Sequence, residues 1–157
     1  MVTGGILLKY ENAFAAIPLL VTFVPMLMDT GGNSGSQAST MIIRGMAVGE
    51  GEPSDIMKVV WKELRVGVLC GVGLALVNFI RLMLQYPGQL MICLTVVMSI
   101  FFTVIIAKTI GCTLPILAKV IHLDPAIMAA PMITTIVDAC SLMIYFQLAC
   151  RLLGLLG

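Results

Sequence analysis

Long apolar runs separated by short polar connections dominate the chain. Four runs, at residues 13–48, 66–84, 90–118 and 126–156, match or exceed the roughly 20 apolar residues that a membrane-spanning helix needs. Residues 86–89 read Tyr-Pro-Gly-Gln, which indicates a tight turn because proline fixes φ and glycine accepts a positive φ. The pattern predicts an all-α integral membrane protein, a helical bundle forming a single transmembrane domain over residues 1–157.

Small and polar residues interrupt the first apolar run. Residues 26–40 read MLMDTGGNSGSQAST, and Pro18 and Pro25 precede the glycines. Proline and glycine both disfavour a regular helix, and irregular backbone at membrane depth is tolerated only inside protein or beside water. We therefore expect a pore helix interrupted by glycine and proline, broken near residues 30–35, with its backbone carbonyls exposed to a water-filled path.

Residues 49–65 form the one long polar stretch and predict a cytoplasmic amphipathic connection. Ser54 or Asp55 would cap a helix there, and Trp61 suits the water–lipid interface. The cytoplasmic assignment rests on a modest bias of basic residues, five (Arg44, Lys58, Lys62, Arg65, Lys119) against three (Lys9, Arg81, Arg151). Both termini would then face outward, so we expect a truncated chain that lacks a preceding helix.

Composition supports lipid as the surrounding medium. The chain is 60% hydrophobic and 11% charged, with a mean hydropathy of +1.09, whereas soluble domains carry about 25% charged residues. A formal net charge of +1 offers no field for nucleic acid. The five cysteines are scattered without a C-x-x-C pair, so we interpret them as apolar packing residues rather than disulfides.

Two carboxylates, Asp29 and Asp138, fall inside apolar runs. At about 1.5 Å per helical residue both lie near the bilayer midplane, where a charge costs at least ~2.5–3.5 kcal/mol. Each should face a cavity or a counter-charge. Further oxygen-bearing side chains lie nearby along the same runs: Asn33, Gln37, Thr134 and Thr135. Such an all-oxygen surface suits a hard divalent cation.

Two other interpretations of these carboxylates remain open. Either aspartate could pair with Lys108 of the third run, although that lysine could also snorkel toward the cytoplasm. The triplet Asp29-Thr-Gly occurs in soluble aspartic proteases on β-structure, but here it lies in a helical pattern. Intramembrane aspartyl proteases use Tyr-Asp and Gly-x-Gly-Asp motifs, which neither aspartate carries. We therefore do not expect an enzyme.

Two segments resemble the MgtE family of magnesium transporters. The stretch IPLLVTFVPMLMDTGGNSGSQASTMIIRGMAVGE is similar to the family's second transmembrane helix, with the spacing P-x(6)-P-x(3)-D-x(2)-G-N-x(3)-Q. The stretch DPAIMAAPMITTIVDACSLMIYF resembles the fifth helix, whose pore aspartate falls on Asp138. The resemblance covers four of the family's five helices. Its first helix and its cytosolic sensing domains have no counterpart here, and Asp29 and Ser36 stand where bacterial members often show Gly and Asn. The aspartate agrees better with the eukaryotic solute-carrier relatives.

The resemblance implies a homodimer in the cell membrane, with a pore between the subunits. Hydrated Mg²⁺ would rest between two copies of Asp138, while backbone carbonyls of the broken helix and of the fifth helix receive its water shell. The candidate metal-site residues are Asp29, Gly32, Asn33, Thr134 and Asp138. Mg²⁺ loses water reluctantly, so a conducting pore should bind it hydrated. Alternatives are transport of Mn²⁺ or Ca²⁺, ion-coupled export and, from another class, intramembrane proteolysis.

Overall fold

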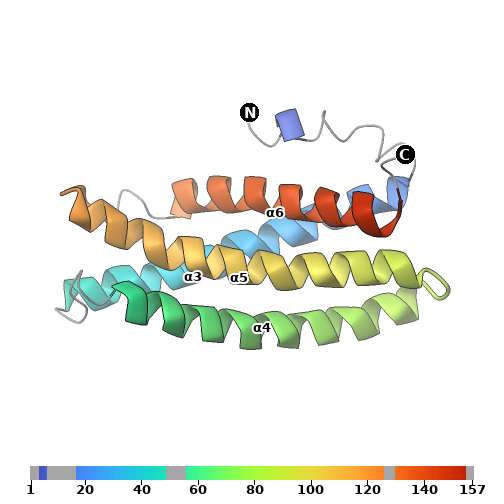
Figure 1. Ribbon diagram of the computed structural model, residues 1–157, viewed down its shortest axis with the longest axis horizontal. Coiled ribbons are helices and arrows are strands. Elements are labelled where there is room, and N and C mark those ends of the chain that lie inside the picture. The colour runs from blue at the N-terminus through green and yellow to red at the C-terminus, as the bar shows by residue number, and fades with distance from the viewer. Residues whose placement is uncertain (1–3, 7–16, 49–55, 126–129, 155–157) are drawn as a thin grey trace.

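The computed structural model describes residues 4–6, 17–48, 56–125 and 130–154. A short 3-10 segment, η1 (Pro18–Phe23), leads into α3 (Val24–Ala47), which is followed by α4 (Ile56–Gln85), α5 (Leu90–Val120) and α6 (Ala130–Leu152). These helices lie side by side, with α5 between α4 and α6 (Figure 1). The described part of the chain contains no strand, so the all-α prediction is confirmed.

Three of the described helices are long and apolar enough to cross a membrane: Met57–Gln85, Leu90–Val120 and Pro131–Leu152. The chain is therefore a multi-pass membrane protein. Helix α4 is longer than the predicted run at residues 66–84. It begins at Ile56, so residues 56–65, which were expected to form part of the connection, are its first turns. The predicted caps Ser54 and Asp55 lie outside the described residues, as does the start of the fourth run at 126–129.

The predicted break near residues 30–35 is wrong. Helix α3 runs without interruption from Val24 to Ala47, and none of its glycines has a positive φ. Close packing explains these glycines instead, since a Cβ at Gly31 or Gly35 would approach atoms of α5 and α6 within 3.2 Å. The irregular backbone lies earlier, in the 3-10 turns of η1 that precede Pro25.

Helix α5 is the centre of the bundle and packs against α3, α4 and α6, whereas α4 packs mainly against α5. The core consists of apolar side chains from η1, α3, α5 and α6, among them Leu20, Leu27, Ile100, Leu142 and Phe146, together with Leu82 of α4. One polar contact crosses this core. The buried Tyr145 hydroxyl donates a hydrogen bond to the Leu20 carbonyl at 2.8 Å and ties η1 to α6.

The connections that follow α4 and α5 are each formed by a residue with positive φ and local backbone hydrogen bonds. Gly88 has φ +91°, and the Gln89 amide donates to the Tyr86 carbonyl at 3.3 Å, so the predicted turn between α4 and α5 is confirmed. After α5, His122 adopts φ +60°, and the Leu123 amide donates to the Ala118 carbonyl at 2.8 Å. This is a Schellman arrangement that satisfies the last carbonyls of α5.

Candidate functional site

Helices α3 and α6 meet at two consecutive glycines. A Cβ at Gly31 would lie 2.8 Å from the Ser141 hydroxyl oxygen and 2.9 Å from a Val137 methyl, so no side chain fits there. A Cβ at Gly32 would lie 3.4 Å from the Thr134 methyl and 3.7 Å from Asp138 Oδ1. The fold therefore brings together three of the predicted site residues, Gly32, Thr134 and Asp138.

The other two predicted residues, Asp29 and Asn33, lie on the exposed side of the same turns. The Asn33 amide nitrogen donates a hydrogen bond to Asp29 Oδ1 at 3.0 Å, along one turn of α3. Both side chains are exposed, and Asp138 is half-buried. Because residues three apart on a helix are neighbours, Asp29 lies next to Gly32, the residue that contacts Asp138. The two carboxylates thus occupy adjoining parts of one face.

These residues belong to a longer polar stripe on α3. We define the polar stripe as the exposed side chains spaced three or four residues apart along this helix: Asp29, Asn33, Gln37, Thr40 and Arg44. The stripe explains why α3 is not among the three apolar spans. Charged and polar groups at membrane depth face protein or water rather than lipid. The described residues of a single copy leave this face of α3 exposed.

The hydroxyl groups near Asp138 are engaged within α6. Thr134 and Thr135 both donate to the Pro131 carbonyl, at 3.1 Å and 2.8 Å. Their hydroxyl hydrogens therefore point along the helix, and each hydroxyl oxygen keeps lone pairs for a water molecule or a hydrated ion. Among the described residues no hydrogen bond or ion pair reaches the Asp138 carboxylate, which leaves it available to a cation.

Lys108 does not neutralise either aspartate, so that alternative is wrong. Its Nζ lies 3.6 Å from Glu63 Oε2 of α4, and the two side chains are 9% and 6% exposed. Sequence reasoning missed Glu63 because it was assigned to the polar connection rather than to a spanning helix. Gly67, one turn along α4, lies beside the lysine stem, since a Cβ there would be 3.5 Å from Lys108 Cδ, an ordinary contact distance.

Within the described ranges, no group of three His, Cys, Asp or Glu side chains could hold a metal ion. The five cysteines are all free, as predicted. One copy of the chain therefore offers a pair of neighbouring carboxylates rather than a chelating cage. This arrangement suits an ion that keeps most of its water, because water molecules can bridge the ion to oxygens at a greater distance.

Sequence comparison shows which known proteins the chain is similar to. The chain is 33% identical over 153 residues to the magnesium transporter MgtE of Bacillus subtilis, and 34% identical over 153 residues to that of Thermus thermophilus. These alignments cover 95% and 98% of this chain. The magnesium transporter MgtE of Enterococcus faecalis is 26% identical over 151 residues, or 95% of this chain.

The chain spans only about a third of the length of these curated relatives, between 33% and 34% of each. A family model described as MgtE, divalent cation transporter, matches residues 24–148, from the start of α3 to near the end of α6. The matched region contains the polar stripe, the Glu63–Lys108 pair and Asp138. Because this match extends over most of the chain, the chain belongs to the MgtE family of divalent cation transporters.

Proposed function

We propose that the chain conducts hydrated Mg²⁺ across the membrane through a pore between two copies of itself. The observation that carries this proposal is the Asp138 carboxylate, which lies against Gly32 and beside the polar stripe within a bundle of spanning helices. The names of the relatives support magnesium as the ion. The family consists of transporters, which rules out the alternative of intramembrane proteolysis.

The chemistry of the path favours a hydrated dication. Mg²⁺ needs octahedral oxygen at roughly 2.0–2.1 Å and exchanges its water slowly. A pore that removed those waters would bind the ion too tightly to conduct it. Asp29 and Asp138 supply negative charge, while the side chains of Asn33 and Thr134 supply further oxygens for the water shell. Selectivity over Na⁺ and K⁺ then follows from the size and charge of the hydrated ion.

The homodimer follows from the exposed polar stripe. A charged stripe facing lipid would cost at least ~2.5–3.5 kcal/mol for each buried charge, and a second copy of α3 across a water-filled path would remove this cost. Two copies also double the number of carboxylates around the path, to four. The same oxygens could accept Mn²⁺ or Ca²⁺, and coupled export would use the same path, so the ion and the direction of transport have to be measured.

The test is ion uptake by liposomes that contain the purified chain, with Mg²⁺, Mn²⁺ and Ca²⁺ compared. We expect Mg²⁺ uptake in wild type and loss of most of it in Asp138→Asn, which keeps the shape of the side chain and removes its charge. Asp124→Asn, in the connection after α5, is the matched control and should transport normally. Near-normal Mg²⁺ uptake by folded Asp138→Asn would overturn the assigned role.

A further inference from the structure

We propose that α4 carries a binding site for one anionic phospholipid, in the leaflet at the N-terminal end of this helix. The headgroup would sit near the start of the helix, on Lys62 and Arg65, and an acyl chain would follow the groove between α4 and α5. This site is separate from the ion path, because α4 packs mainly against α5 and carries no residue of the polar stripe.

The headgroup end is a basic and aromatic face. Lys58, Lys62 and Arg65 are spaced three or four residues apart, and Trp61 lies four residues before Arg65, so they share one side of α4. All four side chains are exposed. The Arg65 guanidinium carbon lies 5.2 Å from the centre of the Trp61 ring, a cation–π contact that holds the guanidinium at the depth of the indole. Trp61 is 55% exposed, as expected for a residue at the headgroup level of a bilayer.

Within the described turns of α4, the acidic side chain points away from this face. Glu63 is buried against α5, where it pairs with Lys108. Cations near the membrane surface attract anionic lipids, each contributing about a fivefold increase in affinity. The two exposed cations Lys62 and Arg65 therefore favour a negatively charged headgroup over a zwitterionic one.

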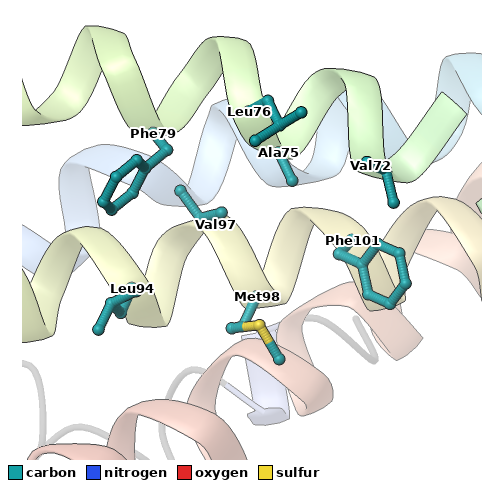
Figure 2. A pocket seen from close by; sticks show the side chains of 8 residues that line it. All are labelled: Val72, Ala75, Leu76, Phe79, Leu94, Val97, Met98 and Phe101. Atoms are coloured by element: carbon teal, nitrogen blue, oxygen red, sulfur yellow. The ribbon is translucent and has the colours of Figure 1, made fainter.

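An apolar path continues from the basic face. A groove of about 390 Å³ is lined by Trp61, Arg65, Val68 and Leu69 together with Leu64. Further along α4, Val72, Ala75 and Phe79 continue the three- or four-residue spacing and line a second groove of about 370 Å³ against α5. Figure 2 shows side chains from both helices converging on this second groove, with Phe79 and Phe101 near its two ends.

The dimensions fit a single lipid molecule. Seven residues separate Arg65 from Val72, which is about 10 Å along a helix axis, and the hydrocarbon half-thickness of a leaflet is roughly 15 Å. A headgroup held at Arg65 therefore places its acyl chain along Val68 and then in the groove of Figure 2. The charged end and the apolar end of the site occur in the order and at the separation that a phospholipid requires.

The experiment uses the fact that Trp61 is the only tryptophan of the chain. Purified protein is placed in phosphatidylcholine vesicles that contain an equal small fraction of either brominated phosphatidylglycerol or brominated phosphatidylcholine, and quenching of Trp61 fluorescence is measured. We expect the relative affinity for the anionic lipid to exceed that for the zwitterionic lipid at least about fivefold, and raised salt to reduce this preference.

Variants of basic residues test which of them cause the preference for the anionic lipid. Lys62→Gln with Arg65→Gln should lower the preference at least about fivefold while keeping Trp61, and Arg151→Gln, at the far end of the bundle, should leave it unchanged. Equal quenching by the two brominated lipids in wild type would overturn the proposal. Weak quenching by both lipids would also overturn it, because it would mean that a protein surface, such as the α4 of a second copy, covers this face.

Discussion

Helices α3 and α5 approach each other closely at Gly35 and Gly111, and Gly111→Ala tests this approach directly. A Cβ at Gly111 would overlap the Gly35 carbonyl oxygen and lie 2.9 Å from the Gly35 carbonyl carbon and 3.0 Å from its Cα. These neighbours are backbone atoms, so no side-chain rotation can relieve the contact. The substitution can be accommodated only if the two helices move apart.

The expected loss of stability follows from the distances between the new Cβ and the backbone atoms of Gly35. Carbon atoms pack best at about 3.5–4.0 Å, so a Cβ held 3.0 Å from the Gly35 Cα requires a displacement of at least roughly 0.5–1 Å. Overpacking of this kind costs about 1–3 kcal/mol, and the backbone contact favours the upper half of that range. Alanine recovers up to about 1 kcal/mol of helix propensity. We therefore expect Gly111→Ala to lower the free energy of unfolding by about 1–2 kcal/mol.

The assay is reversible unfolding in mixed detergent micelles, followed by circular dichroism. Gly73→Ala is the matched control, since a Cβ at Gly73 has no atom within 4 Å and the residue also lies inside a helix. This control should be as stable as wild type or slightly more stable. If Gly111→Ala and Gly73→Ala have the same free energy of unfolding, a side chain at position 111 does not force α3 and α5 apart, and the reasoning is wrong.

Three further substitutions test other contacts. Lys108→Met leaves the Glu63 carboxylate buried without its partner and should cost about 3–5 kcal/mol; the double variant with Glu63→Leu should recover most of this loss in the same unfolding assay, and no recovery would argue against the pair. Tyr145→Phe removes the hydrogen bond to the Leu20 carbonyl and should cost about 1–3 kcal/mol, so wild-type stability would contradict that role. Gly32→Ala adds a methyl group at ordinary contact distance, so it should fold normally yet reduce Mg²⁺ uptake, and unchanged uptake would remove Gly32 from the path.

The spanning helices could be predicted from the sequence because their apolar length is a local property. Gly32 and Asp138 could also be placed near the same membrane depth, and the fold puts them in contact. Counting residues along a helix gives only the membrane depth, and every spanning helix has residues at that depth, so it was the packing of α3 against α6 that brought these two residues together. The roles of Asp29, Asn33 and Thr134 toward an ion stay predictions.

Other features depend on neighbours that no local pattern reveals. A glycine cluster has the same appearance in sequence whether it interrupts a helix or lets helices approach, and only the atoms of α5 and α6 around Gly31 and Gly35 distinguish the two. The Glu63–Lys108 pair joins residues from different helices, and it exists because α4 extends beyond its apolar part. Both errors came from inferring long-range packing from short-range composition.

The register between α3 and α5 also constrains how the chain is assembled during synthesis. Gly31 packs beside Thr103 and Gly35 beside Ala107, so the two helices run in the same direction. Parallel neighbours cannot form a hairpin, and α4 must first carry the chain back across the bilayer. Chains are made from the N-terminus, so α3 with its charged groups is synthesised before the partner that covers its glycines. The contacts that α5 makes with the glycines of α3 can therefore form only after α4 and α5 have been synthesised.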